Sequence, residues 1–470
     1  MPEPKKVFEI FSKLSKIPRG SGNTQKATLF CVDYAKKLGL DYKTDEAGNV
    51  IIYKNGSKGY ENHPAVILQG HLDMVCEKTA EKVIDFETEG LTLLTDGEFL
   101  FADGTTLGGD DGIAVAIILA LLSDDSLSHP PIEAVFTTDE ETGMDGARAL
   151  DTSFLKGKTM INLDSEDEHT LWVSCAGGAR ANIDIPVKRV SKKCENTYLV
   201  TLGNLCGGHS GTEIDKGRIN AVKSLSAFLS SLPDIELFEF KGGLMDNAIP
   251  REATAVIGTD DISIIRKKAE DYKKVLKEKH PCENELSITV NECSTNLLPL
   301  SFESFKNILG FINESQNGVI AMSKKIDGLV ETSLNLGIMK LCENEINISF
   351  SLRSSVNTEK EKLYATLSEC AENHNGSFSV HGEYPAWEYN EVSPLREVFS
   401  KEYEKIYNKK CELRAIHAGL ECGIFYDKIN GLDCVSFGPD ILDIHTPEER
   451  LSIPSVNHVY TLVKNVLKEL

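Results

Sequence analysis

Apolar residues in the first 180 positions follow two different spacings. In residues 4–17 and 24–40 they recur every three to four positions, which predicts amphipathic helices, and the segment 113–124, which is apolar as far as residue 122, also predicts a helix. Short runs with the composition of strands lie at 49–54, 65–70, 133–138 and 159–164. Because strands and helices alternate, we predict an α/β fold with a mostly parallel sheet and helices on both faces.

The segment from residue 181 to residue 385 repeats an order of elements. Strands are expected at 198–204, 253–258, 285–292, 346–355 and 377–383. Helices are expected at 221–232, 262–279, 301–315 and 359–373. The order occurs roughly twice, which indicates a duplicated α+β unit, although no sequence identity between the halves supports it.

The last segment returns to the style of the first, with helices expected at 394–407 and 455–470 around a strand at 434–439. A chain of 470 residues is long enough for at least two domains. Two arrangements fit: three consecutive domains, or a catalytic domain of residues 1–180 and 386–470 interrupted by a lid domain of residues 181–385. We favour the insertion, because the last segment supplies a histidine that the first segment needs.

Composition narrows the classes of partner. The net charge of −22 disfavours nucleic acid and anionic membrane surfaces. The N-terminal residues show no signal peptide, and the longest apolar run, 113–122, is too short to span a bilayer. The 12 cysteines contain no C-x-x-C pair, which is typical of reduced thiols. We therefore expect a cytoplasmic protein.

Histidines and carboxylates cluster where the expected strands end. These residues are His71, Asp73, Asp139, Glu140, Glu141 and Asp164, with His445 in the loop after the strand at 434–439. In open α/β sheets ligands bind outside the carboxyl ends of the strands, so these side chains should converge at one edge. Imidazole nitrogens and carboxylate oxygens together suit a metal such as zinc.

A glycine-rich turn places Asp110 and Asp111 at the start of the apolar helix. Taken alone, the pair is typical of a helix cap, because aspartate complements the helix dipole there. Beside the strand-end residues, a metal ligand becomes the better interpretation for this pair. His71 has its own alternative, a hydrogen-bonded histidine of the core.

Eight motifs resemble those of the di-zinc exopeptidase family of dipeptidases, aminoacylases and glutamate carboxypeptidases. In chain order they are GHLDMV, TTLGGDDGIA, FTTDEETG, INLDSED, CGGHSG, NAIPREA, HAGLECG and IHTPEERL. Their order and spacing are most similar to the bacterial aminoacyl-histidine dipeptidase branch. The resemblance runs from near the N-terminus to the C-terminus and implies an α/β catalytic domain with an inserted α+β lid.

The resemblance also implies roles for the clustered residues. His71 and Asp164 would hold one zinc, Glu141 and His445 the other, and Asp110 would bridge both. Asp73 would orient the imidazole of His71, as partners of ligating histidines do. Glu140 would be the general base. A cis peptide between Asp110 and Asp111 is implied as well.

For the lid, the resemblance implies that His209 stabilises the oxyanion of the tetrahedral intermediate. Asn247 and Arg353 would hold the carboxylate of the substrate, since the planar guanidinium matches two oxygens. His417 and Glu421 would lie near the pocket, with Glu421 meeting the free amino group of the substrate. The alternatives are an exposed loop histidine for His209 and a surface ion pair for Arg353. The remaining histidines, such as His63, His129, His280 and His374, are read as solvated.

The function implied is hydrolysis of unblocked dipeptides, Xaa-His and β-alanyl-histidine among them, by a metal-bridging hydroxide. The cofactors would be two zinc ions, and cobalt or manganese suit the same donors. The alternatives are a related amidohydrolase, such as an aminoacylase or tripeptidase, and a non-catalytic binding protein on the same fold. Neither nucleic acid nor membrane is expected as a partner. The resemblance allows both a homodimer and a monomer whose lid replaces the second subunit.

Overall fold

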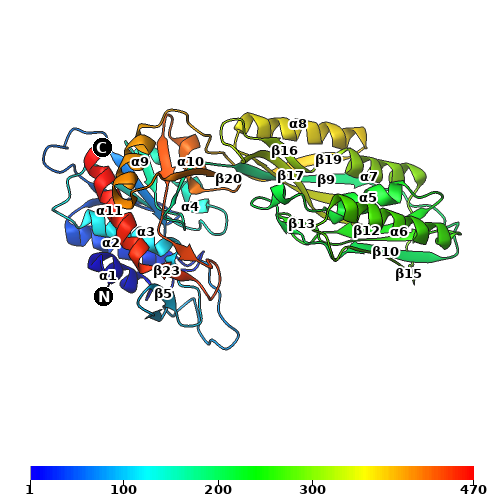
Figure 1. Cartoon of the computed structure of the whole chain (residues 1–470), viewed down its shortest axis with the longest axis horizontal. Helices are drawn as coiled ribbons and strands as arrows, with labels where there is room; N and C mark the ends of the chain where they lie inside the picture. Colours follow the sequence, from blue (N-terminus) through cyan, green and yellow to red (C-terminus); the bar gives the residue numbers. More distant parts are fainter. Residues whose placement is uncertain (1) are drawn as a thin grey trace. The chain divides into compact units, whose positions relative to one another are not determined.

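The computed structural model describes residues 2–470, which form two compact units (Figure 1). The first unit holds the chain up to Ser174 together with Tyr389–Ala415 and Leu420–Leu470. The second unit holds Cys175–Glu388 and Ile416–Gly419. The boundaries therefore lie a few residues from the expected 181 and 385, and residues 416–419 lie in the second unit instead of the first.

The first unit is built on an eight-stranded sheet in the order β1-β2-β6-β3-β7-β21-β8-β20. Its strands are β1 (Asp41–Thr44), β2 (Val50–Lys54), β3 (Val66–His71), β6 (Ile132–Thr137), β7 (Thr159–Asn162), β8 (Thr170–Cys175), β20 (Glu412–Ile416) and β21 (Asp433–Ser436). The central strands β6, β3, β7 and β21 are parallel, whereas β1, β2 and β8 pair antiparallel with their neighbours. Strand β21 comes from the C-terminal segment and lies between β7 and β8.

Helices cover this sheet in layers. They are α1 (Lys5–Leu14), α2 (Gln25–Leu38), α3 (Gly109–Leu122), α4 (Asp145–Ala149), α9 (Pro394–Tyr407), α10 (Glu421–Lys428) and α11 (Ile453–Glu469). Helix α3 packs on β3 beneath α1, while α9 packs on β21 beneath α11. All residues of α3 are buried, which explains why its sequence is apolar on every face.

A small second sheet of the first unit has the order β22-β23-β5-β4. Its strands are β4 (Leu93–Thr95), β5 (Phe99–Ala102), β22 (Ile441–Leu442) and β23 (Arg450–Ser452). The loop between β22 and β23 carries His445, so this sheet anchors both ends of that loop.

The second unit contains a nine-stranded sheet in the order β15-β10-β14-β12-β17-β18-β9-β19, with β16 paired to β17. Its strands are β9 (Gly177–Pro186), β10 (Thr197–Gly203), β12 (Glu236–Gly242), β14 (Ala253–Gly258), β15 (Ser287–Cys293), β16 (Gly318–Met322), β17 (Val330–Leu341), β18 (Glu345–Ser354) and β19 (Ser377–Tyr384). Its helices are α5 (Ala221–Ser230), α6 (Ile262–Lys279), α7 (Phe302–Glu314) and α8 (Asn357–Asn373). The short strands β11 (Gly208–His209) and β13 (Ala248–Ile249) pair separately.

This sheet contains the duplication expected from the order of elements. The chain runs β10-α5-β12-β14-α6-β15 in one half and β9-α7-β17-β18-α8-β19 in the other. In each half the fourth strand lies beside the first, and the third lies between the first and the second. The second strands, β12 and β17, meet antiparallel in the middle of the sheet. The first half is therefore inserted between β9 and α7 of the second.

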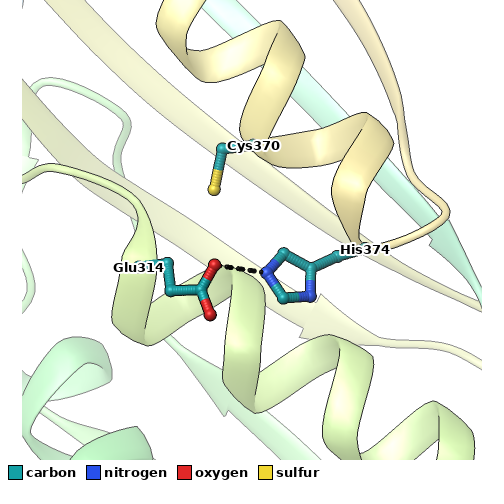
Figure 2. Close-up of side chains that lie close together, drawn as sticks. All are labelled: Glu314, Cys370 and His374. Carbon is teal, nitrogen blue, oxygen red and sulfur yellow. Dashed lines mark hydrogen bonds and ion pairs between the residues drawn. The ribbon is translucent and has the colours of Figure 1, made fainter.

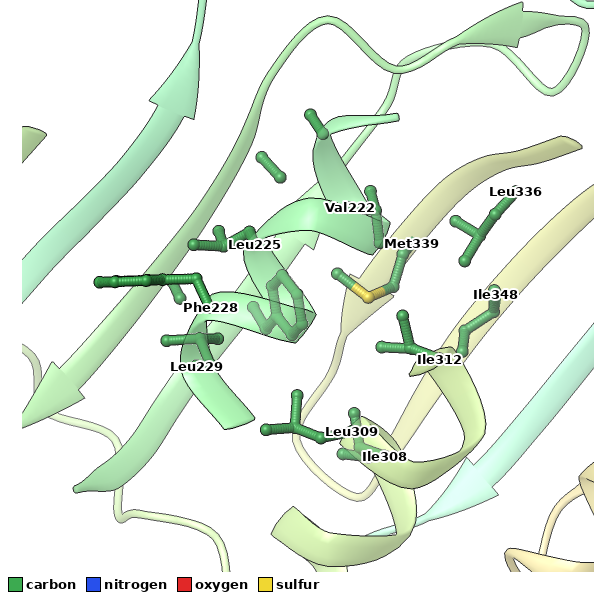
Figure 3. Close-up of a cluster of buried hydrophobic side chains, with 14 of the residues drawn as sticks. Val222, Leu225, Phe228, Leu229, Ile308, Leu309, Ile312, Leu336, Met339 and Ile348 are labelled. Atoms are coloured by element: carbon green, nitrogen blue, oxygen red, sulfur yellow. The ribbon is translucent and has the colours of Figure 1, made fainter. Parts of the chain in front are cut away.

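Apolar side chains of both halves share one core. Figure 3 shows Leu225 and Phe228 of α5 beside Ile308 and Ile312 of α7, and these residues are fully buried or nearly so. Helices α5 and α7 pack against each other, and α5 contacts strands of both halves. Burying one such side chain contributes about 1.5–3 kcal/mol, so this cluster holds the two halves together.

Two further observations concern the whole described chain. No helix among residues 2–470 is long and apolar enough to cross a membrane. All 12 cysteines of the chain lie in this range, and each is a free thiol.

Candidate metal centre

Parallel strand ends bring the predicted residues of the first unit together. Strand β3 ends at His71, β6 ends just before the turn of Glu140 and Glu141, and β7 ends just before Asp164. Because these strands are parallel and adjacent, their carboxyl ends lie at one edge of the sheet. The convergence that the sequence predicts is therefore present.

Two groups of donor atoms form at this edge and share Asp110. In the first, His71 Nε2 lies 3.1 Å from Asp110 Oδ1 and 3.6 Å from Asp164 Oδ1. In the second, His445 Nε2 lies 3.2 Å from Asp110 Oδ2 and 3.0 Å from Glu141 Oε2. The donor atoms of each group lie within 4.8 Å of one another. Each oxygen of Asp110 thus faces a different group, and the nitrogen and oxygen donors suit divalent metals such as zinc.

The backbone at the start of α3 aims the two adjacent aspartates differently. Asp110 and Asp111 have non-helical backbone angles, and the peptide bond between them is cis, as the resemblance implies. Asp111 Oδ2 accepts a hydrogen bond from the backbone N–H of His71 at 3.0 Å. The carboxylate of Asp111 is therefore engaged by β3, which leaves Asp110 as the member of the pair that faces both donor groups.

Asp73 is completely buried and lies beside the donor groups, in contact with His71 and with the turn of the two glutamates. Its Oδ1 lies 3.3 Å from His71 Nδ1 and accepts the backbone N–H of Glu140 at 3.1 Å. Its Oδ2 accepts the backbone N–H of Glu141 at 3.3 Å and the hydroxyl of Ser21 at 2.8 Å. Burial would raise the pKa of Asp73, but the bonds from His71, Ser21 and Glu140 hold it at about 2. Asp73 thus lies beside the imidazole of His71 and accepts hydrogen bonds from the turn of the two glutamates.

The surplus of carboxylates raises the proton affinity of several groups. Burial raises the pKa of Glu140 well above its usual range, and the nearby carboxylates of Asp164, Glu421 and Glu141 raise it further. Hydrogen bonds to Asp110 and Glu141 raise the pKa of His445 to about 10. A site with this electrostatic character favours protons or metal cations.

Two residues of the centre have left-handed backbone conformations although neither is glycine. The φ angle is +54° at Asp139, next to Glu140, and +61° at His445. Such a conformation costs roughly 1–2 kcal/mol per residue, and such costs gather at functional sites. Gly22 compensates at Asp139, since its N–H donates to Asp139 Oδ1 at 2.6 Å.

In the second unit, His209 lies on β11 with its ring held by backbone amides. His209 Nδ1 accepts the N–H of Gly211 at 3.3 Å and the N–H of Thr212 at 3.2 Å. In the neutral ring the proton is therefore on Nε2, which is left as a donor. Burial lowers the pKa of His209, and the charge of Arg353 lowers it further.

The other predicted residues of this unit have distinct surroundings. His417 Nε2 lies 2.7 Å from Ser333 Oγ, and burial together with the charges of Arg353 and His209 lowers the pKa of His417 to about 3. Arg353 Nη1 donates to the hydroxyl of Tyr384 at 2.8 Å. Asn247 and His209 line a cavity of about 750 Å³, to which Arg353 and His417 contribute no lining. The charge of Arg353 thus acts on both His209 and His417, whereas His209 and Asn247 line the same cavity.

Glu421 corrects one expectation from the sequence. Its side chain is completely buried, and Oε2 accepts hydrogen bonds from Gln69 Nε2 at 2.5 Å and Thr137 Oγ1 at 2.7 Å. Burial raises the pKa of Glu421 to about 8. The carboxylate lies beneath β3 and β6 and is not open to the amino group of a substrate in this structure. The motif identified the neighbourhood but could not indicate the depth of the side chain.

Two histidines expected to be solvated are not. His129 is 2% exposed, and its Nδ1 lies 2.6 Å from the carbonyl oxygen of Pro130. His374 is 13% exposed, and its Nε2 lies 2.9 Å from Glu314 Oε2. Figure 2 shows this pair joining α7 to the end of α8, with Cys370 nearby as a third donor. No spacing in the sequence pairs residues 60 positions apart, so this cluster had no sequence signal.

Sequence reasoning also missed Arg19 and Glu449. Both are buried, with exposures of 1% and 2%, and both bond to the backbone beside the predicted ligands. Glu449 lies in a motif that the sequence singled out, but only His445 of that motif received a role. What distinguishes these two residues is that they are charged and buried. One sequence does not show burial, so no signal in it could have identified them.

Two donor groups that share a carboxylate, at the carboxyl edge of a parallel sheet, form the kind of two-metal site that many metal-dependent hydrolases use. The chain belongs to the peptidase family M20/M25/M40, whose model matches residues 67–469. The family predicted from the motifs is therefore confirmed, and so is the α/β fold class.

Individual relatives support this assignment over the full length. The chain is 36% identical over 475 residues to the cytosol non-specific dipeptidase of Escherichia coli strain K12, which covers 99% of this chain and 98% of the relative. It superposes on the crystal structure of aminoacylhistidine dipeptidase from Vibrio alginolyticus with a TM-score of 0.95 and 34% identity, covering 100% of this chain and 97% of that one. Aminopeptidase PepT from Bacillus cereus, at TM-score 0.60 and 15% identity, shares the fold.

Proposed function

We propose that the protein is a dipeptidase that hydrolyses unblocked dipeptides with two metal ions, and that dipeptides ending in histidine are among its substrates. The observation that carries the proposal is Asp110, whose two oxygens face separate histidine-containing donor groups. The names of the two full-length relatives, a non-specific dipeptidase and an aminoacylhistidine dipeptidase, support the choice of dipeptides.

We assign His71, Asp110 and Asp164 to one cation and Asp110, Glu141 and His445 to the other, with zinc as the native metal. Bound cations would polarise the scissile carbonyl and make the attacking water more acidic. Cobalt and manganese remain chemically suitable substitutes.

Glu140 is assigned as the general base. It belongs to neither donor group, and Asp73 holds its backbone N–H. Its raised pKa matches a group that must accept a proton from water and pass it to the leaving amine. Because Asp73 also holds Glu141, the base and the adjacent ligand keep a fixed relation.

We propose that the second unit acts as a lid and supplies the groups that bind the substrate. His209 would donate from Nε2 to the oxyanion, since its Nδ1 is engaged by backbone amides. Arg353 and Asn247 would take the carboxylate of the dipeptide. His417, held neutral beside Arg353, would support the same region.

We also propose a cellular location, partners and an oligomeric state for the enzyme. A cytoplasmic location is supported by the name of the relative from Escherichia coli. Small peptides are the proposed partners, with neither nucleic acid nor membrane. A homodimer stays a prediction that sedimentation at several protein concentrations would test.

The test is amine release from β-alanyl-His, Gly-His, Ala-Ala, an N-acetyl amino acid and a tripeptide. Each substrate is assayed with the purified protein, after chelation and after zinc is restored. We expect cleavage of the free dipeptides alone, lost on chelation and regained with zinc. Cleavage of only the blocked amino acid or the tripeptide would move the protein to a sister activity. No turnover with metal bound would favour a binding protein.

A further inference from the structure

The carboxylate of Glu449 accepts hydrogen bonds from four consecutive backbone N–H groups. Oε2 accepts from Leu107 at 2.7 Å and from Gly108 at 3.0 Å. Oε1 accepts from Gly109 at 2.8 Å and from Asp110 at 3.4 Å. These bonds occupy the roughly four acceptor positions of a carboxylate, so Glu449 is engaged by the backbone and is not a metal ligand itself.

The carboxylate of Glu449 lies at the N-terminus of α3, where the backbone N–H groups need acceptors. The first N–H groups of a helix have no partner within the helix, and Gly108, the residue before α3, has no capping side chain of its own. Glu449 supplies the missing acceptors from a distant part of the chain. Its negative charge is also favourable at the positive end of the helix dipole. Glu449 therefore fixes the turn that carries Asp110.

The other attachment of Glu449 is the loop that carries His445. Glu449 lies four residues after His445, and its N–H donates to the carbonyl oxygen of Thr446 at 3.2 Å. One side chain thus ties the loop of His445 to the turn of Asp110. These are the two residues whose side chains face each other at 3.2 Å in the second donor group.

Arg19 holds the same turn through its carbonyl groups. Arg19 Nη1 donates to the carbonyl oxygens of Leu72 and Asp73, each at 2.8 Å, and Nη2 donates to that of Gly108. Gly108 has a φ of +62°, and a Cβ there would overlap Arg19 Nη2. Arg19 therefore connects the turn of Asp110 to the segment that follows His71, and its charge offsets that of Glu449.

We propose that Glu449, with Arg19, is a positioning residue that holds the shared carboxylate of Asp110 against His71 and His445 and so sets the cation affinity of the centre. The inference rests on the metal centre assigned under the proposed function. Both side chains are buried and bond to backbone groups beside the donor residues. Losing a residue that supports metal ligands typically weakens metal affinity by about 10–100-fold, which is the effect expected here.

The test compares Glu449→Gln with Glu448→Gln in the full-length protein. Glu448 is the exposed neighbour, so the control makes the same charge change in the same loop. Cobalt(II) affinity of the metal-free proteins is measured by competition with a chelator, and the visible spectrum of the cobalt form is recorded. We expect Glu449→Gln to bind cobalt about 10–100-fold more weakly with an altered spectrum, and Glu448→Gln to match the parent.

Unfolding in urea separates positioning from stability. If Glu449→Gln is less stable but binds cobalt with the affinity and spectrum of the parent, the residue has only a structural role and the inference is overturned. If Glu449→Gln does not fold, Glu449→Asp replaces it: this variant keeps the charge but withdraws it by one methylene, and parent-like cobalt binding in it equally overturns the inference.

Cobalt binding is measured independently of peptide turnover. Weaker binding in Glu449→Gln, found in a protein that cleaves none of the peptides, would support the inference and reject the dipeptidase assignment. If Glu449→Gln binds cobalt like the parent and the parent cleaves dipeptides, the inference is rejected and the dipeptidase assignment is supported. A parent protein that binds no cobalt would reject the metal centre and the inference together.

Discussion

Histidines of the two units have opposite electrostatic surroundings. In the first unit, hydrogen bonds to Asp110 and Glu141 raise the pKa of His445 to about 10. In the second, burial and the charge of Arg353 lower the pKa of His417 to about 3. The first environment attracts cations, whereas the second keeps imidazoles neutral and favours anions. Carboxylate partners therefore raise the pKa of the imidazole in the first unit, whereas burial beside a guanidinium lowers it in the second.

The partners of each imidazole show the same contrast. Asp73 approaches His71 Nδ1, so that Nε2 faces Asp110 and Asp164 in the first donor group. In His209 the partners of Nδ1 are backbone N–H groups, so Nε2 carries the hydrogen and can only donate. One arrangement suits a ligand for a metal, and the other suits a hydrogen-bond donor to an oxyanion.

The largest expected effect is on kcat when Glu140, the proposed base, is replaced. The metal content of the same variant distinguishes a base from a metal ligand. Glu140→Gln should lower kcat by about 10²–10⁴-fold, because the amide cannot accept the proton of water. Its metal content, measured by mass spectrometry of the native protein, should equal that of the parent. Glu141→Gln is the matched neighbour and should lose metal. A Glu140→Gln protein that also loses metal would place Glu140 among the ligands.

Replacing His209, the proposed oxyanion donor of the second unit, should lower kcat and leave metal affinity unchanged. His209→Ala should lower kcat by about 10²–10³-fold, the usual effect of removing one oxyanion donor, with cobalt affinity unchanged. His209→Gln offers an amide N–H at about the reach of Nε2 and should recover part of the loss. Weaker cobalt binding in His209→Ala would contradict the separation of roles between the two units.

The neutral His417 should make the metal-free protein less stable in acid. The folded pKa of about 3 lies below the ordinary value of 6.5, so between these values the unfolded chain binds more protons. The free energy of unfolding should therefore fall as the pH falls from 6.5 towards 3, by a few kcal/mol. His417→Gln should show a shallower fall in urea titrations at pH 4 to 7. An unchanged slope would mean that His417 is solvated when folded.

The smallest effect on metal binding is expected at the cluster of Glu314, Cys370 and His374 in the second unit. His374→Ala should leave the cobalt stoichiometry at that of the parent, because the cluster has few carboxylates and Cys370 lies near the charge of Lys223. The cost in stability should be at most about 1 kcal/mol, since Glu314 is 66% exposed. Loss of one equivalent of cobalt in His374→Ala would identify a third metal site.

The strands that the sequence pattern did not predict show why patterns fail inside the duplicated sheet. Strands β9, β12, β16 and β17 were not expected, although β12 and β17 meet at the middle of the sheet. Strand β9 begins with GGARAN, and β17 mixes polar and small residues within VETSLNLGIMKL. Small or polar residues in a fully paired strand are satisfied by their neighbours, which leaves no clear alternation.

Local geometry is why so much of the site could be predicted from one sequence. A strand end delivers its next residues to a known edge of the sheet, so the sequence alone was enough to group His71, Glu140, Glu141 and Asp164. The family and the α/β class followed from the same motifs and are confirmed. The choice of Asp110 over Asp111 agrees with the backbone of the turn, which aims only Asp110 at both donor groups.

Contacts between distant segments were decided only by the tertiary structure. Glu449 bonds to residues more than 300 positions away, and Glu421 is buried beneath β3 and β6 although the resemblance placed it near the pocket. Periodicity records which face of an element is apolar, but it does not record which distant backbone group a buried charge will meet. The sequence by itself therefore determined the family and the grouping of ligands, and the packing of remote segments decided how those ligands are held.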